Sequence, residues 1–514
     1  IGKPLSKGIV RSILLLKILT YIKGYSGIRY TLVKIIINFL NNDIIPVIPE
    51  KGSVGASGDL APLAHMALAI IGEGKVFYNG KIVSTRHALK DANLTPILLH
   101  QKEGLSLING TQLSTALAIK CLLDGELILK SMDIAGALSV ENSYSSRKVF
   151  KKEVHQIKQH PGQQLVARNI YKILFSSEIV KSHLNCSRVQ DPYSFRCIPH
   201  VHGACRDSFD NALNVINNEI NSVSDNPLVL KNEDIISSGH FHAEHIAQSL
   251  DFLSISFSEL GSISERRIHF MMKGIEKKTS PFLALKPGLE SGYMIAHVTA
   301  ASLASENKTL SHPASVDNIT TSAGQEDFVS MAPWAGQKLL KIQDNIFNII
   351  AIELLVSGAA NYSQSTNPNT ANKGDTSIEI TDLDNCFGIG DYISIESTGS
   401  LRIASNGPLQ YRNGLQYTGS SAGVGNSFDS GSLEELMLRH QLIGNSPFQQ
   451  YSPNPISGSI HNGNYKTYSF SEYTHQIQND EVTQIVSASG NIAYVQKMYG
   501  KQGEIQSDMG LYSR

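Results

Sequence analysis

The chain has 514 residues, of which 41% are hydrophobic and 17% charged, and its formal net charge is −1. This length suits two or three domains with a large buried core, and the composition is that of an ordinary globular protein. A net charge so close to zero excludes the strong basic field with which proteins attract nucleic acid or anionic membranes.

Two apolar runs open the chain, at residues 9–22 and 30–40. Each is interrupted by a lysine and is shorter than the roughly 20 residues that a membrane-spanning helix needs. We therefore predict two buried helices and no membrane partner. Because the chain begins at Ile1, without methionine or a signal-peptide pattern, we expect a fragment or a processed chain.

The next stretch, residues 52–65 (GSVGASGDLAPLAH), places Ala56, Ser57 and Gly58 directly before Asp59 and a helical run. The Gly58 nitrogen is an unhindered backbone nucleophile, and its attack on the Ala56 carbonyl would close a five-membered ring. Loss of water from that ring and from the Ser57 side chain would leave an exocyclic methylidene, which is an electrophile. The alternative is that Ser57 or Asp59 only caps the helix that follows.

Helical patterns continue to about residue 362. In residues 207–223 the apolar side chains recur at helical spacing on one face. We predict further long helices at residues 241–272, 293–310 and 336–356. The fold class that follows is mainly α, a bundle of long helices, and we assign residues 1–362 to one helical domain.

The composition changes at Gly358–Ser377, which is polar and lacks apolar periodicity, and we predict a linker over residues 363–377. Alternating runs at residues 378–383, 391–397 and 400–405 predict strands. Asn413-Gly414 indicates a hairpin, and Ser432 and Glu435 have the spacing of a capping box before a helix at residues 432–442. Residues 378–514 are therefore a separate tail, either rich in β-structure or partly disordered.

The cysteines and histidines suggest neither disulfides nor a metal site. The five cysteines are odd in number and form no Cys-x-x-Cys pair, which favours free thiols in a reducing compartment such as the cytoplasm. The 17 histidines include His240, His242 and His245, whose spacing lacks the usual zinc-ligand sets. We expect no metal.

Motifs in a fixed order along residues 1–362 closely resemble the aromatic amino-acid ammonia-lyases, and within them the enzymes that act on histidine. The most specific is residues 52–68, GSVGASGDLAPLAHMAL. The others are GYSGIR at 24–29, EGLSLINGTQ at 103–112, VQDPYSFRC at 189–197, SDNPLV at 224–229, FHAE at 241–244, SERRI at 264–268, ASENK at 304–308 and QED at 325–327. The tail matches nothing in that family.

The resemblance implies a set of site residues. Ala56, Ser57 and Gly58 would form the cofactor 4-methylidene-imidazole-5-one (MIO) by autocatalysis, without a metal. The other implied roles are Asn109 and Tyr193 beside the ring, Arg196 on the substrate carboxylate, Gln190, Asn226 and Phe241 along the pocket, and Glu326 facing the imidazole. Phenylalanine enzymes carry an amide at the position of Glu326.

Each of these residues also has a structural alternative. Arg196 could be an ion-pair partner, and Tyr193 and Phe241 could be core aromatics. Asn109 and Asn226, next to glycine and proline, could form turns. Glu326 and Asp327 could be an acidic pair at a helix N-terminus.

The function implied by the resemblance is non-oxidative deamination of L-histidine to urocanate and ammonia by a homotetramer whose active sites draw on several subunits. Two alternatives stay open: a tyrosine or phenylalanine lyase of the same family, against which Glu326 argues, and a truncated or fused chain with a structural or binding role. By the same resemblance, the N-terminal segment that carries the family's catalytic loop tyrosine, and its C-terminal helices, are expected to be missing. Without that tyrosine the general base is not assigned.

Overall fold

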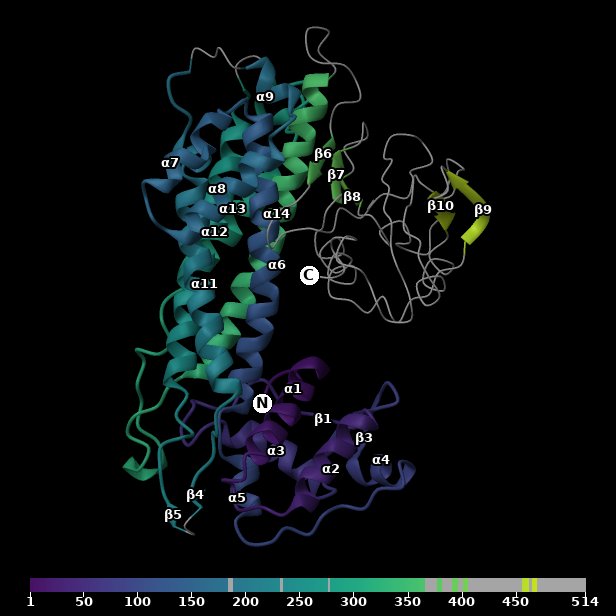
Figure 1. Ribbon diagram of the computed structural model, residues 1–514, viewed down its shortest axis with the longest axis vertical. Coiled ribbons are helices and arrows are strands. Elements are labelled where there is room, and N and C mark those ends of the chain that lie inside the picture. The colour runs from purple at the N-terminus through teal and green to yellow at the C-terminus, as the bar shows by residue number, and fades with distance from the viewer. Residues whose placement is uncertain are drawn as a thin grey trace. The chain divides into compact units, whose positions relative to one another are not determined.

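The computed structural model of the chain describes residues 1–183, 188–231, 234–275 and 278–365, together with five short strands farther along (Figure 1). Within this range it forms two compact units. The first unit comprises Ile1–Gly125, Ser208–Phe257 and Lys308–Gln343, and the second comprises Glu126–Asp207, Ser258–Asn307 and Asp344–Arg514. Most of the described residues are helical, which confirms the predicted fold class.

Five of the described helices contribute residues to both units, because a unit boundary falls inside each of them: α13 (Met294–Leu310) and the four longest helices. The four longest are α6 (Gln112–Asn142), α11 (Ile198–Ile220), α12 (Glu244–Met272) and α14 (Ala332–Ser365). Parts of α11, α12 and α14 were predicted, at residues 207–223, 241–272 and 336–356, whereas α6 was not. Helix α14 runs through Ser365, past the change of composition at Gly358, because Ala359 and Ala360 are small enough to stay buried on the same helix.

The first unit begins with the two apolar runs, which form α1 (Lys7–Tyr21) and α2 (Tyr30–Asn41) as predicted. Its other short helices are α3 (Leu60–Ile70), α4 (Thr85–Asp91) and α5 (Glu103–Ile108), with the turn η3 (Ser322–Gly324). An antiparallel sheet in the order β1-β2-β3 joins Ile45–Pro46, Lys75–Tyr78 and Lys81–Ser84, and β4 (Leu228–Val229) pairs with β5 (Ile235–Ile236).

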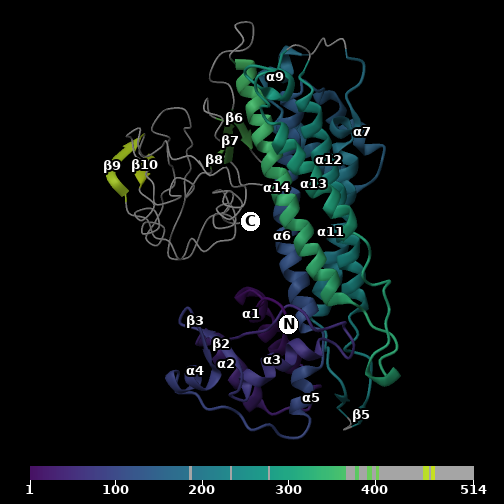
Figure 2. The same cartoon turned by 180° about the vertical axis from the view of Figure 1, so that it is seen from behind.

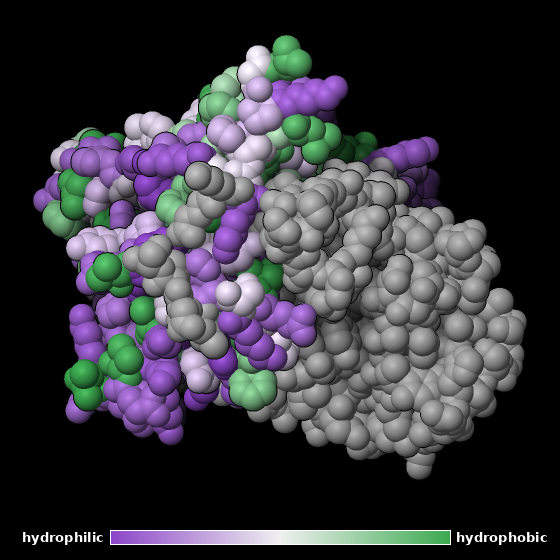
Figure 3. Space-filling model, turned by 90° about the horizontal axis from the view of Figure 1, so that it is seen from above, coloured by the Kyte–Doolittle hydropathy of each residue, from purple (hydrophilic) through white to green (hydrophobic). Residues whose placement is uncertain are grey.

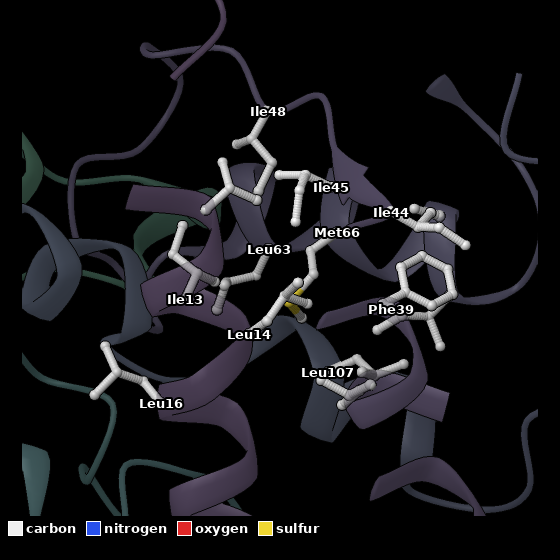
Figure 4. Packing of buried hydrophobic residues seen from close by; sticks show 14 of the residues in the cluster. Ile13, Leu14, Leu16, Phe39, Ile44, Ile45, Ile48, Leu63, Met66 and Leu107 are labelled. Carbon is white, nitrogen blue, oxygen red and sulfur yellow. The ribbon is translucent and has the colours of Figure 1, made fainter. Parts of the chain in front are cut away.

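The core of the first unit fixes the position of α3. Ile13 and Leu14 of α1 pack with Leu63 and Met66 of α3 and Leu107 of α5, and all five side chains are fully buried (Figure 4). Burying one such side chain stabilises a fold by about 1.5–3 kcal/mol. The apolar runs therefore serve to hold the start of α3, where the Ala56-Ser57-Gly58 segment ends.

The second unit packs α13 (Met294–Leu310) with parts of the long helices, and Figure 2 shows α6 and α14 side by side there, as Figure 1 does. Its short helices are η1 (Arg147–Phe150), α7 (Lys152–Gln156), α8 (Pro161–Ile173), α9 (Glu178–Ser182), α10 (Tyr193–Arg196) and η2 (Pro281–Leu283). Close approach depends on small residues, since a Cβ on Gly162 of α8 would lie 2.3 Å from the carbonyl oxygen of Gly203 on α11.

A buried charge pair crosses the second unit between α12 and α14. The fully buried guanidinium of Arg267 donates to both carboxylate oxygens of Glu353, at 2.5 and 2.9 Å. The hydroxyls of Ser139 and Ser264 donate to the same carboxylate. Each carboxylate oxygen of Glu353 thus accepts two hydrogen bonds, which offsets the cost of burying its charge.

Three of the predicted strands appear beyond residue 365, as β6 (Ser377–Ile380), β7 (Asp391–Ile395) and β8 (Leu401–Ala404), which form one antiparallel sheet in that order. A second pair, β9 (Pro455–His461) and β10 (Tyr465–Tyr468), had no predicted counterpart. The hairpin expected at Asn413-Gly414 and the helix expected at residues 432–442 lie outside the described residues.

Across the described ranges, no helix combines the length and the apolarity that crossing a membrane would require. Figure 3 shows one face of the molecule, on which apolar side chains appear in separate places among polar ones. The same described residues contain no cluster of three or more His, Cys, Asp or Glu side chains arranged to hold a metal ion.

Candidate active site

The Ala56-Ser57-Gly58 segment lies in the loop between β1 and α3. Ser57 has a φ of 49° and Gly58 a φ of 81°, both in the left-handed region that glycine enters without strain. A Cβ on Gly58 would lie 2.3 Å from the carbonyl oxygen of Gly110. The close approach of two main chains therefore requires glycine at position 58, independently of any reaction.

The partner of this loop is the turn Asn109–Gly110, which follows α5. Gly58 and Gly110 form a parallel β-bridge, and the Asp59 N–H donates to the Gly110 carbonyl at 2.9 Å. On its other side, a Cβ on Gly110 would lie 2.2 Å from the carbonyl oxygen of Ser224. The turn is thus confined between the Ala56-Ser57-Gly58 segment and Ser224.

Asp59 stands at the N-cap position of α3, but its side chain makes no capping hydrogen bond. Its carboxylate instead accepts from the Ser114 amide at 2.8 Å and the Ser114 hydroxyl at 2.9 Å, at the start of α6. Burial raises the pKa of Asp59 to about 6. The capping alternative is therefore wrong for the Asp59 side chain, which ties the loop to α6.

The Ser57 hydroxyl does not cap the helix either. It donates to Oε1 of Glu326 at 2.6 Å, although the two residues are far apart in sequence. Oε2 of Glu326 accepts from the hydroxyls of Thr321 at 2.8 Å and Ser322 at 2.6 Å. The bond from Ser322, followed by that from Ser57, holds the pKa of Glu326 below its usual value.

Two features of this arrangement differ from the sequence-based alternatives. Glu326 is not part of an acidic pair at a helix N-terminus, because α14 begins at Ala332. Thr321 and Ser322, which orient its carboxylate, were not predicted. The hydroxyl-rich run before Gln-Glu-Asp was the signal that could have identified them.

Asn109 carries the main-chain carbonyl to which the Nζ of Lys17 donates. The Oδ1 atom of Asn109 is buried, with no hydrogen-bond partner among the described residues. Lys17 is fully buried in α1, and burial lowers its pKa to about 7. The sequence pattern alone marks Lys17 only as a lysine that interrupts the apolar run at residues 9–22.

Asn226 and Phe241 belong to the first unit as well. The Oδ1 of Asn226 accepts from the Ser238 amide at 2.6 Å, so its side chain braces the segment around β4 and β5. Its neighbour Asp225 is fully buried and accepts from Lys102 at 2.9 Å and the Ser106 hydroxyl at 2.6 Å. Phe241 is half-buried just before α12.

Gln190, Tyr193 and Arg196 form a second group, in the second unit. Nη2 of Arg196 donates to Oε1 of Gln190 at 2.9 Å, and its guanidinium carbon lies 4.6 Å from the centre of the Tyr193 ring. Tyr193 is 70% exposed, so it is not a core aromatic. Within the described part of the chain Arg196 makes no ion pair, which leaves its guanidinium available to a carboxylate.

The structure therefore brings Ala56, Ser57, Gly58, Asn109 and Glu326 together in the first unit, and Gln190, Tyr193 and Arg196 together in the second. The first group combines a strained small-residue loop with an ionised carboxylate. The second presents a planar array of N–H donors beside an exposed phenol.

Comparisons with known proteins agree with these motifs. The aromatic amino acid lyase family matches residues 1–377. The histidine ammonia-lyase of Vibrio cholerae serotype O1 is 50% identical over 360 residues, which cover 70% of this chain and 70% of that protein. The histidine ammonia-lyase of Myxococcus xanthus is 46% identical over 361 residues, covering 70% of this chain and 71% of the other.

Solved structures give the same fold. The crystal structure of histidine ammonia-lyase from Trypanosoma cruzi has a TM-score of 0.65 at 38% identity and covers 73% of this chain and 71% of that one. The phenylalanine aminomutase of Pantoea agglomerans has a TM-score of 0.67 at 30% identity, covering 71% of this chain and 75% of that chain.

Proposed function

The chain belongs to the aromatic amino acid lyase family, and we propose that it deaminates L-histidine without oxidation, releasing urocanate and ammonia. Identity of 46–50% to several histidine ammonia-lyases supports this substrate over phenylalanine or tyrosine. The observation that carries the proposal is the 2.6 Å contact between Ser57 and Glu326. It sets the carboxylate expected to recognise imidazole directly against the segment expected to become the electrophile.

The residues around Ala56-Ser57-Gly58 fit the MIO ring. Glycine at 58 gives the nucleophilic nitrogen the freedom to approach the Ala56 carbonyl, and Ser57 already has a left-handed backbone. The buried Oδ1 of Asn109, without a hydrogen-bond partner among the described residues, leaves one acceptor for a group bound beside the turn. When formed, the ring supplies an electrophile that takes up the substrate amine and turns it into a leaving group.

Glu326 would orient the substrate. Its lowered pKa keeps the carboxylate ionised at neutral pH, so it accepts a hydrogen bond from an imidazole N–H. In the unmodified chain the Ser57 hydroxyl donates to Oε1 of Glu326. Ring formation would remove this hydroxyl as water, and Oε1 would then be free to accept a hydrogen bond from the substrate. Thr321 and Ser322 keep the carboxylate in place through Oε2.

Arg196 would bind the substrate carboxylate, since a guanidinium presents donors that match a carboxylate in pairs. Its bond to Gln190 and its contact with the Tyr193 ring restrain the side chain before substrate arrives. Because family members are expected to be homotetramers with shared active sites, we propose that this chain assembles likewise.

The test is an assay of purified chain with L-histidine, L-phenylalanine and L-tyrosine, following urocanate or cinnamate-type absorbance and ammonia release. A Ser57→Ala variant, which has no hydroxyl to eliminate, serves as the control. Urocanate formation that depends on Ser57 is expected. Selective turnover of phenylalanine or tyrosine would refute the assignment of histidine.

A further inference from the structure

Lys17 is the one fully buried lysine among the described residues of the first unit. It lies on the buried face of α1, whose other buried side chains are mostly apolar, with Thr20 as a polar exception. Burial lowers its pKa to about 7, so the fold bears a real cost in placing an amine there. Because burying this amine destabilises the fold, we expect a local interaction of Lys17 that explains its position.

Lys17 makes such an interaction. Its Nζ donates to the main-chain carbonyl of Asn109, and the next residue, Gly110, is the one that pairs with Gly58. The carbonyl of Gly110 in turn accepts the Asp59 N–H. Lys17 is therefore linked to the Ala56-Ser57-Gly58 segment through the Asn109–Gly110 turn: it binds Asn109, and Gly110 binds the main chain next to Gly58.

Neighbouring charges do not supply a competing partner. The carboxylate of Asp225 raises the pKa of Lys17, but it already accepts from Lys102 and Ser106. Asp59 acts on Lys17 in the same direction while it binds Ser114, and Lys102 acts against it. On α1 itself, the ring of Tyr21 lies 5.6 Å from Nζ and stabilises the cation.

Gly110 has little room to move if the hydrogen bond from Lys17 to Asn109 is lost. The Ser224 carbonyl confines one side of the turn and Gly58 the other, with the contacts given above. If the Asn109 carbonyl lost its donor, it would be a buried acceptor without a partner, and the turn would relax to find one. Because Ser224 confines the other side of the turn, we expect such a shift to disturb the Gly110–Gly58 contact.

We propose that Lys17 is a positioning residue, whose ammonium group holds the Asn109–Gly110 turn against Gly58 so that Ala56-Ser57-Gly58 closes its ring. This rests on the proposed function, because the ring is the cofactor expected there. The role concerns ring formation and loop order, and it assigns Lys17 no contact with substrate.

The experiment compares the wild-type chain with Lys17→Met, which keeps the apolar stem, and Lys17→Arg, which keeps a cationic donor. Lys34→Met is the control, because Lys34 is an exposed lysine on α2 of the same unit. Folded protein is isolated by size exclusion. Peptide mass spectrometry then measures the fraction of residues 56–58 that has lost two waters over time after synthesis, and hydrogen exchange measures protection of the Asp59 amide.

Lys17→Met should slow the loss of two waters by about 10²-fold, the typical effect of a small misplacement of reacting groups, and should speed exchange at Asp59. Lys17→Arg should restore most of both, and Lys34→Met should match the wild type. If Lys17→Met does not fold, Lys17→Leu, which also lacks a donor, replaces it with the same expected result.

Wild-type rates of water loss and exchange in Lys17→Met would overturn the proposal, as would an arginine variant no better than the methionine variant. If the wild-type chain itself lost no water, the proposed function would fail. The exchange data would still decide whether Lys17 orders the turn.

Discussion

Replacing Glu326 by glutamine tests whether this carboxylate selects the imidazole ring. Glutamine keeps the size of the side chain and can still bond to Thr321 and Ser322, so the loop around η3 should hold its shape. What changes is the charge. The lowered pKa means that the wild-type residue is an anion throughout the neutral range, and the variant is not.

The magnitude follows from the kind of hydrogen bond that is lost. A bond to a charged group contributes about 1.5–3 kcal/mol, against about 0.5–1.5 kcal/mol for a neutral pair. The difference of about 1–2 kcal/mol corresponds to roughly a 5- to 30-fold weakening of imidazole recognition. Because Glu326 is only half-buried, water screens the charge, and the lower half of this range is the better expectation.

The assay measures kcat/KM for L-histidine and the inhibition constant of L-phenylalanine in both proteins. The expected result is a fall for histidine with little change, or a gain, for phenylalanine, whose ring offers no N–H. Glu73→Gln, which removes a charge from an exposed pair with Arg86, is the control for a general electrostatic effect. Equal losses for both ligands would refute the role of Glu326 in selecting imidazole.

Three further changes test the loop and the buried charges. In Gly58→Ala the added methyl group would meet the Gly110 carbonyl at 2.3 Å, so peptide mass spectrometry should find the segment largely without water loss. Glu353→Ala leaves the Arg267 guanidinium buried without its carboxylate and should lower the free energy of unfolding by about 3–5 kcal/mol in urea titration, whereas Glu353→Leu combined with Arg267→Met should recover most of that loss. In the wild type, the free energy of unfolding should rise between about pH 7 and 10 by up to about 1.4 kcal/mol per pH unit, because the unfolded chain keeps a Lys17 proton that the folded chain has released. In Lys17→Met, urea titration at several pH values should show a weaker rise.

Apolar spacing predicted the helices at residues 207–223 and 336–356, because it records which face of a helix is buried. The other helices were predicted from long runs of compatible composition. Residues 9–22 and 30–40 became α1 and α2, and residues 241–272 became α12 with a start at Glu244. The spacing did not indicate that α14 would continue through Ser365, because alanine and serine give a weak apolar pattern although they favour close packing.

Most of the candidate site residues were predicted from the resemblance of the motifs to the aromatic amino-acid ammonia-lyases, and their roles stay predictions. The order Ala56-Ser57-Gly58 allowed ring formation by the reactivity of its atoms, but helix capping was also an available interpretation until the surrounding motif was compared with the family. Lys17 and Thr321 carry no such signature, since a lysine in an apolar run and a hydroxyl in a loop are common. Their roles depend on tertiary contacts with Asn109 and Glu326, which local patterns do not contain.

The first unit places two costly groups, Asp59 and Lys17, on either side of the same turn. Burial drives their pKa values toward each other, to about 6 and about 7, because a low-dielectric environment disfavours both charges. Each group nevertheless holds one strand of the Gly58–Gly110 contact, Asp59 through Ser114 and Lys17 through Asn109. A bare apolar core could not fix two main chains in this way, since only hydrogen bonds specify which carbonyl faces which amide. The stability given up at these two positions therefore fixes the Gly58–Gly110 contact, and the proposed ring closure would require that fixed geometry.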